Sequence, residues 1–243
     1  ATISFLFDNF SKDFTNGEIK RKFIISSSKT KDIVLTMFVY LILMCIFIIL
    51  GSFVYYAFVA NTANNMSFSL QHFKYVFDND VLENIYNSLL IAFMVSIFGT
   101  IIAYFTAYVT ARIGGKSAKF IHILAISSLA IPGIVLGLSY TISFKNTFIY
   151  NTYTILILVN IVHFMASPYL MAYNALQKVN KNYEIVAKTC NINMFRAIKD
   201  IIIPCTKITI REMFAYFFVN SMVTISAVTF LFNTSTMPLS LLI

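Results

Sequence analysis

The residues best suited to chemistry form a short polar series inside an apolar part of the chain. Asn160, His163 and Ser167 recur at i, i+3 and i+7, which places them on one face of a helix. A histidine can act as a general base or bind a metal, but a catalytic site needs a second acidic or basic partner, which this series lacks. We therefore predict that the chain is not an enzyme and that it binds no metal and no cofactor itself.

This series belongs to a chain that is 58% hydrophobic and 12% charged, with a mean hydropathy of +0.78. A soluble domain is typically about 25% charged, so this chain has too few charges to cover a water-facing surface. Five windows are long and apolar enough to cross about 30 Å of hydrocarbon as helices. They are residues 33–60, 87–111, 120–144, 153–176 and 208–232. The predicted fold is an all-α, polytopic membrane bundle with five transmembrane helices.

The basic residues are distributed unevenly between the loops of this bundle. Of the 18 lysines and arginines, all except Lys74 and Lys145 precede the first window or lie at the connections between the second and third and between the fourth and fifth. By the positive-inside rule these regions are cytoplasmic, and so is the N-terminus. The net charge of +8 thus follows the membrane topology, and we expect no nucleic-acid partner.

Other residues inside the windows bear on helix packing and on passage of a solute. Pro132 removes a backbone hydrogen bond and predicts a kink in the third window, where Gly133 and Gly137 form a GxxxG pair. Polar groups in the fourth and fifth windows would be costly against lipid, so they face protein or a pathway. The fifth-window group is Asn220, Ser221, Thr224 and Ser226. Both interpretations, helix-helix hydrogen bonding and a polar pathway, stay open.

Residues 182–204, NYEIVAKTCNINMFRAIKDIIIP, combine charged residues with aliphatic residues at helical spacings. Asn191 lies near the middle of this segment, and asparagine readily takes the left-handed conformation that ends a helix. We expect two short helices joined by a turn at Asn191, with Pro204 marking the entry into the last window. On pattern alone, the segment either docks a protein partner or lies on the lipid headgroups as an amphipathic connector.

The same segment resembles the EAA loop of importer-type ABC permeases, whose pattern runs roughly E-x-A-A-x-x-x-G to a terminal L-P. Glu184 and Ala187 stand at the acidic position and the second alanine, and Pro204 closes the segment after an aliphatic residue. Val186 replaces the first alanine and Asn191 replaces the glycine. Asparagine can supply the positive φ of that glycine at some cost, so the geometry of the motif is retained.

The resemblance extends to three further stretches, in the order that the family has them. They are NSLLIAF from Asn87, AIPGIVLGLSY from Ala130 and FVNSMVTISAVTFL from Phe218. The Pro-Gly stretch and the last stretch are most similar to the ferric-iron and 2-aminoethylphosphonate permeases. The chain is therefore identified as a member of the ABC importer permeases, with a MetI-like fold.

The resemblance implies a permease subunit of the bacterial inner membrane that forms half of a translocation pathway. Its solute, ferric iron or a phosphonate, would come from an extracytoplasmic binding protein. ATP and Mg would be bound by a separate cytoplasmic ATPase dimer that docks on residues 182–204. The positions carried over for this docking are Glu184, Ala187 and Asn191, with Met194, Phe195 and Arg196 as contacts beside the turn.

The same resemblance divides the chain into two parts. Residues 1–32 would be a basic cytoplasmic segment or a linker between two permease halves, and residues 33–243 a permease domain whose sixth helix is missing at the C-terminus. The second half would be fused or separately encoded. Two alternatives remain: an ion-coupled secondary transporter, for which His163 is the candidate ionisable residue, and a permease of the same family for a polyamine, thiamine or an oxyanion.

Overall fold

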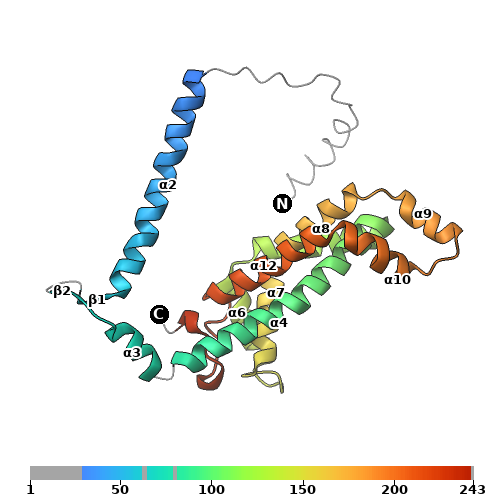
Figure 1. The fold of residues 1–243 in the computed structure, drawn as a ribbon. Coiled ribbons are helices and arrows are strands. Elements are labelled where there is room, and N and C mark those ends of the chain that lie inside the picture. The colour runs from blue at the N-terminus through green and yellow to red at the C-terminus, as the bar shows by residue number, and fades with distance from the viewer. Residues whose placement is uncertain (1–28, 62–64, 79–80, 242–243) are drawn as a thin grey trace. The chain divides into compact units, whose positions relative to one another are not determined.

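The computed structural model describes residues 29–61, 65–78 and 81–241, so the predicted segment 1–32 lies outside the described residues apart from 29–32. The described part of the chain is mainly helical (Figure 1). It separates into two compact units, Ala1–Asp80 and Val81–Ile243. Each unit is considered by itself.

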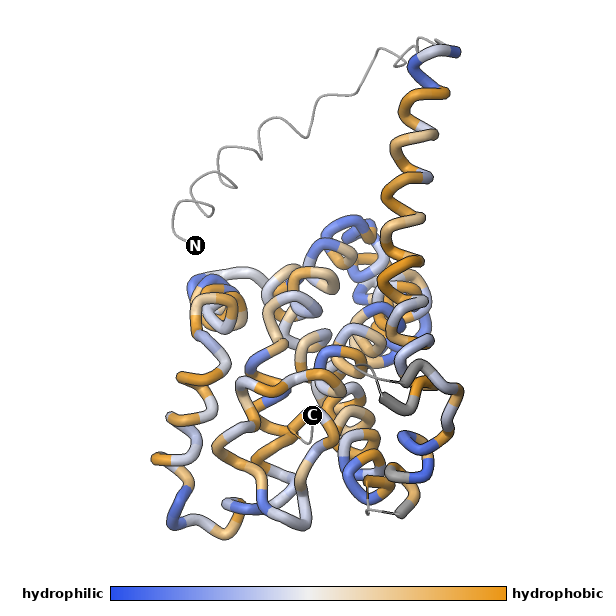
Figure 2. Tube along the Cα trace, turned by 90° about the vertical axis from the view of Figure 1, so that its left-hand side faces the viewer, coloured by the Kyte–Doolittle hydropathy of each residue, from blue (hydrophilic) through white to orange (hydrophobic). Residues whose placement is uncertain are grey.

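The first unit contains one long helix and a small hairpin. Helix α2 spans Lys29–Ala57, and its 29 residues are apolar along nearly the whole length (Figure 2). At about 1.5 Å per residue, this is more than enough to cross about 30 Å of hydrocarbon. Strands β1 (Val59–Asn61) and β2 (Asn65–Phe68) pair antiparallel and are followed by α3 (Gln71–Asp78). The first predicted span is therefore confirmed as a helix.

The second unit is the helical bundle. Its elements are α4 (Val81–Tyr108), the π-helix η1 (Val109–Ile113), α5 (Gly115–Ser127), η2 (Ser128–Ala130), α6 (Gly133–Phe144), α7 (Tyr153–Phe164), α8 (Ala166–Lys178), α9 (Asn182–Thr189), α10 (Met194–Ala197), the π-helix η3 (Ile198–Ile202), α11 (Ile203–Cys205), α12 (Lys207–Val223), η4 (Thr234–Thr236) and η5 (Leu239–Leu241). Helices α4, α8 and α12 lie side by side (Figure 1). The prediction of an all-α polytopic bundle is confirmed.

Small residues allow the close approach of α4 to its neighbours. Ala92, Ser96, Ala103 and Ala107 are fully buried. Gly99 lies between them, and a Cβ atom added there would come within 2.9 Å of the Phe217 ring of α12. Small side chains at helix contacts are the usual means of packing in a membrane, where helices gain little from the hydrophobic effect.

The third and fourth predicted spans are broken. The pair formed by Gly115–Ala130 and Gly133–Phe144 bends by 108°, far more than the kink that Pro132 predicts. The pair formed by Tyr153–Phe164 and Ala166–Lys178 bends by 54°. Pro168 explains the second bend, because a proline cannot donate to the carbonyl four residues earlier, here Phe164, and its ring disfavours a continuous helix.

The fifth predicted span is helical only in its first part. Helix α12 ends at Val223, and Thr224 is extended, with its carbonyl accepting a hydrogen bond from Ser240 Oγ at 2.7 Å. The prediction of helix through residue 232 was therefore wrong. The C-terminal residues instead return to the bundle, where the backbone N–H of Leu239 donates to Ser88 Oγ at 2.7 Å.

Hydrogen bonds identify the two ends of the bundle. At one end, Asn87 Nδ2 near the start of α4 donates to the carbonyl of Ser235 at 3.1 Å, and Tyr153 Oη at the start of α7 donates to Asn87 Oδ1 at 2.7 Å. At the other end, Tyr108 at the last residue of α4 contacts Glu184 of α9. The loops at residues 112–119 and 178–207, which carry the basic residues, therefore share this second end.

Candidate functional site

The turn predicted at Asn191 is present. Asn191 has φ of 54° and follows α9 directly after its C-cap, Cys190. The N–H of Ile192 donates to the carbonyl of Ala187 at 2.8 Å, and the N–H of Asn191 donates to that of Lys188 at 3.1 Å. This pair of bonds is the Schellman motif, which satisfies the last carbonyls of a helix and requires a left-handed residue at its centre.

A second short helix starts immediately after the turn. Asn193 caps α10, with Oδ1 accepting from the backbone N–H of Phe195 at 3.1 Å. Side-chain caps of this kind satisfy an otherwise unpaired N–H at a helix start. The two helices α9 and α10 thus form a hairpin at one end of the bundle (Figure 1).

The hairpin presents an apolar surface to the outside. Phe195 is 76% exposed, and Ile185, Val186 and Met194 are also exposed. Ala187, Ala197, Ile198 and Ile202 are buried and attach the hairpin to the bundle. The exposed ion pair between Arg196 and Asp200, at 3.4 Å, lies on the same segment. We call the surface formed by Ile185, Val186, Met194 and Phe195 the hairpin patch.

Glu184 is directed toward the bundle and is only 16% exposed. Its Oε1 accepts a hydrogen bond from Tyr108 Oη at 3.0 Å and lies 3.6 Å from Arg112 Nε. Glu184 therefore faces the bundle, unlike Met194, Phe195 and Arg196, which are exposed. The resemblance assigned all four residues to docking of the ATPase. Its carboxylate holds α9 against the end of α4.

Arg112 is the most unusual polar residue of this region. Its side chain is 1% exposed, and none of its three side-chain nitrogens has a hydrogen-bond acceptor among the described residues. A buried guanidinium is usually paired through several hydrogen bonds, because an unsatisfied buried donor costs about 1–3 kcal/mol or more. Here the Glu184 carboxylate is the ion-pair partner, and it is at a longer distance than a charge-assisted hydrogen bond.

The polar series of the fourth span is divided by the bend. Asn160 is fully buried in α7, with Nδ2 donating to the Leu156 carbonyl at 2.8 Å, whereas Ser167 lies beyond the bend in α8. The i, i+7 relation that would align Ser167 with Asn160 requires one straight helix, and the 54° bend removes it.

His163 packs at the break of the third span. A Cβ atom added to Gly133 would lie 3.0 Å from His163 Cε1, and closer still to the hydroxyl of Ser226. His163 Nδ1 is buried without a hydrogen-bond partner in the described part of the chain. Pro132, in extended conformation, precedes Gly133 at the start of α6. The segment after α12 therefore meets the α6 start and the end of α7.

Gly137 lies against the backbone of the segment after α12, and the fifth-span group is buried or half-buried. A Cβ atom on Gly137 would lie 2.5 Å from the carbonyl oxygen of Ala227. Asn220 Nδ2 donates to the Tyr216 carbonyl at 2.7 Å, and Ser221 is buried with no hydrogen-bond partner for Oγ among residues 29–61, 65–78 and 81–241. Thr224 is buried at the end of α12.

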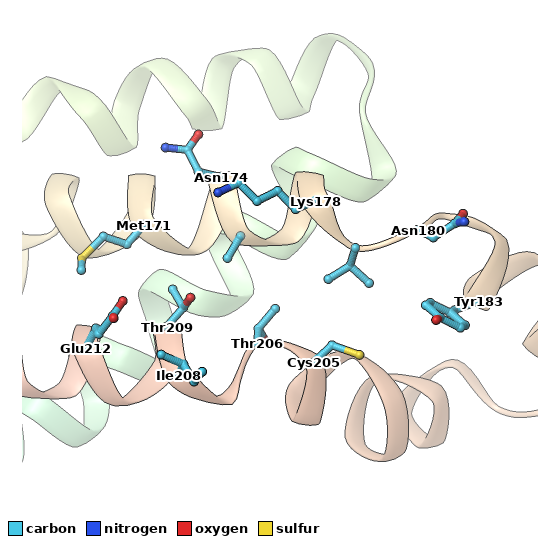
Figure 3. Close-up of a pocket in the computed structure, with 12 residues that line it drawn as sticks. Met171, Asn174, Lys178, Asn180, Tyr183, Cys205, Thr206, Ile208, Thr209 and Glu212 are labelled. Atoms are coloured by element: carbon cyan, nitrogen blue, oxygen red, sulfur yellow. The ribbon is translucent and has the colours of Figure 1, made fainter. Parts of the chain in front are cut away.

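A groove of about 750 Å³ lies between α8 and α12, next to the start of the hairpin (Figure 3). Helix α8 contributes Asn174 and Lys178 to its lining, and α12 contributes Thr209 and Glu212. Glu212 lies inside the fifth predicted span and is an ionisable residue within a span, as is His163 in the fourth, which the prediction names alone. Charged residues within spans seldom face lipid.

Sequence reasoning also missed three residues of α4 and η1 that contact the hairpin segment: Tyr108 and Arg112 contact Glu184, and Tyr104 contacts Thr206. Tyr104, Tyr108 and Arg112 are spaced four residues apart, which places them on one face of α4 and η1. A polar-aromatic series ending in an arginine was a usable signal. The topology prediction uses Arg112 only as a positive charge of the cytoplasmic loop.

Comparison with known proteins identifies a family that this chain matches. The model of the family described as binding-protein-dependent transport system inner membrane component matches residues 99–243. The protein named ferric transport system permease protein FbpB 1 of Haemophilus influenzae is 25% identical over 196 residues. These residues cover 76% of this chain and 30% of that protein. The ferric transport system permease protein FbpB of Actinobacillus pleuropneumoniae is 24% identical over 200 residues, covering 78% and 28%. The chain spans less than a third of either relative.

Proposed function

The chain belongs to the binding-protein-dependent transport system inner membrane component family, and from this premise we propose that it forms half of the translocation pathway of an ABC importer. In this proposal the chain is a multi-pass component of the bacterial inner membrane with a cytoplasmic N-terminus. It is a transporter component and not an enzyme, because ATP and Mg are bound by a separate cytoplasmic ATPase dimer. An extracytoplasmic binding protein delivers the solute, and a second permease half, fused or separate, completes the pathway.

The observation that carries the proposal is the helical hairpin around Asn191. It lies within the family-matched residues, at the basic end of the bundle, and exposes the hairpin patch while its other face is buried. An exposed cluster of large apolar side chains beside polar residues is typical of a protein-docking surface. Met194, Phe195 and Arg196 are the proposed ATPase contacts, and Ala187 and Asn191 fix the shape of the hairpin. Glu184 is proposed to hold the hairpin against the end of α4 and to make no contact with the ATPase.

Ferric iron is the solute that the relatives support best. Both are named for ferric transport, and each matches more than three quarters of this chain. Among the described residues, no three His, Cys, Asp or Glu side chains lie together as a group that could hold a metal ion. The proposal assigns capture of the iron to the binding protein, and a phosphonate is the alternative solute.

The groove between α8 and α12 is proposed to face the pathway or the second permease half. Asn174, Lys178, Thr209 and Glu212 give the groove a polar lining from both helices. A second half placed on this side would remove these groups from lipid, which is the energetic reason for the proposal.

The experiment is a pair of matched substitutions in the full-length permease. Phe195→Asp places a carboxylate in the hairpin patch, whereas Phe148→Asp makes the same change at a residue that is 93% exposed in the loop before α7. An unpaired charge buried at an interface costs several kcal/mol, and a micromolar association is worth about 8 kcal/mol in total. We expect Phe195→Asp to weaken ATPase binding by about a hundredfold or more.

The readout is co-purification of the ATPase, identified by mass spectrometry and by ATP hydrolysis. Phe148→Asp should retain the ATPase, and Phe195→Asp should lose it. Retention in both variants would leave the hairpin as a connector on the membrane surface. Loss in both would mean that the effect is not local to the hairpin.

A further inference from the structure

Both ends of the segment that contains the hairpin are attached to one face of α4. Tyr108 and Arg112 contact Glu184 at the start of α9, and Tyr104 contacts Thr206 at the end of the segment. These three residues of α4 and η1 follow one another at intervals of four residues, about one helical turn, and so lie on one face. Neither the family match nor the names of the relatives assigns them a role.

We propose that Tyr104, Tyr108 and Arg112 form a latch that makes the hairpin and the end of α4 move as one body. The proposal rests on the proposed docking of an ATPase on the hairpin, and it adds the residues that pass the movement to the membrane helices. Arg112 is a positioning residue in this scheme, since it acts through Glu184 and touches neither ATPase nor solute.

The first attachment is a buried ion pair supported by a hydroxyl. Glu184 Oε1 is shared by Tyr108 Oη at 3.0 Å and Arg112 Nε at 3.6 Å. Glu184 is on the first turn of α9, whose opposite end forms the Asn191 turn. A displacement of the hairpin therefore acts on α4 through a charged contact that is shielded from water and little weakened by salt.

The second attachment is at the junction with α12. Tyr104 Oη and Thr206 Oγ1 are 2.7 Å apart, and Thr206 is buried. Thr206 Oγ1 also lies 2.9 Å from the Ile202 carbonyl. Since Thr206 separates α11 from α12, this contact ties the start of a long helix to the same face of α4.

Arg112 is joined to the hairpin through Glu184. Its nitrogens lack hydrogen-bond acceptors among the described residues, and the Glu184 oxygen is farther away than the 2.7–2.9 Å typical of a charge-assisted hydrogen bond. The Glu184 carboxylate is therefore the group that compensates the buried positive charge, and removing either partner leaves the other buried without a counter-charge. Arg112 also lies in the π-helix η1, a wide turn of the kind often found at functional sites.

The test measures the distance between hairpin and α4 directly. In the full-length permease with its ATPase, and with the native cysteines replaced, nitroxide labels are placed at Ile113→Cys of η1 and Lys188→Cys of α9, both exposed positions. Electron paramagnetic resonance is recorded without nucleotide and with ATP under non-hydrolysing conditions. The latch predicts a single narrow distance that ATP leaves unchanged.

Arg112→Gln should abolish this single narrow distance, while the ATPase still co-purifies. The matched control is Lys119→Gln in α5, which removes an exposed positive charge at the same end of the bundle and should keep the narrow distance. If Arg112→Gln is poorly folded, Tyr108→Phe removes only the hydroxyl bonded to Glu184 and should also broaden the distance. An unchanged narrow distance in a folded Arg112→Gln or Tyr108→Phe variant would overturn the proposal.

A double-mutant cycle gives a second readout. Arg112→Gln and Glu184→Gln should each disturb the label distance, and together they should do no more than the worse single variant, because they remove the same contact. Additive effects would contradict the latch. A failure of ATPase docking is recognised separately, because Phe195→Asp would then retain the ATPase whatever the distance shows.

Discussion

Replacing Gly137 by alanine tests the close packing at the broken third span. The new Cβ atom would lie 2.5 Å from the carbonyl oxygen of Ala227 and 3.2 Å from its carbonyl carbon. Because the obstructing atoms belong to the backbone, no side-chain rotation can relieve the contact. Either α6 or the segment after α12 has to move.

The magnitude follows from two opposing terms. Overpacking of this kind lowers the free energy of unfolding by about 1–3 kcal/mol, whereas a glycine-to-alanine change inside a helix raises it by about 1 kcal/mol. The expected net loss is up to about 2 kcal/mol, or a few degrees in melting temperature for a chain of this size. Gly51→Ala in α2 is the matched control, because a Cβ atom there meets nothing within 4 Å.

The assay is thermal unfolding of the detergent-purified protein, followed by circular dichroism at one heating rate for all variants. Gly137→Ala should melt below the parent protein, and Gly51→Ala should melt at or above it. Equal melting temperatures of the two variants would mean that α6 does not pack against the Ala227 backbone as closely as described.

Three further predictions concern the turn, the topology and the buried histidine. Asn191→Gly should preserve or raise transport and Asn191→Val should lower it, because φ of 54° suits glycine and strains a β-branched residue. Equal transport by the Val variant and the parent would contradict this. In a background without Cys45, Cys190 and Cys205, a cysteine at Asn146 should react with an impermeant thiol reagent added outside intact cells, and one at Ser117 should not. Labelling of residue 117 from outside would reverse the assigned orientation. His163→Gln should keep uptake and its pH dependence near those of the parent, whereas a selective loss of ion-dependent uptake in the folded variant would favour a secondary transporter.

The parts of the fold that could be predicted are those set by local chemistry. Asparagine tolerates positive φ, so the turn at Asn191 could be placed without knowledge of its surroundings, and the apolar length of residues 33–60 predicts helix α2. Small residues every few positions along α4 likewise predict close packing, and they are buried.

The parts that could not be predicted depend on contacts distant in sequence. Whether Glu184 faces a partner or the bundle depends on Tyr108 and Arg112, more than seventy residues earlier, since the Tyr108 contact spans 76 residues. The end of α12 at Val223 depends on Thr224 meeting Ser240. The bend at Met165 is an exception, because its cause, Pro168, is local and visible in the sequence.

The central claim, that the hairpin docks an ATPase, is tested most directly by photo-crosslinking in cells. A photoreactive phenylalanine analogue is placed at residue 195 in one variant and at residue 148 in another, both positions being exposed phenylalanines. Irradiation should join the ATPase to the permease from residue 195 and not from residue 148. The absence of an ATPase adduct at residue 195, with the permease folded and the ATPase present, would contradict the account.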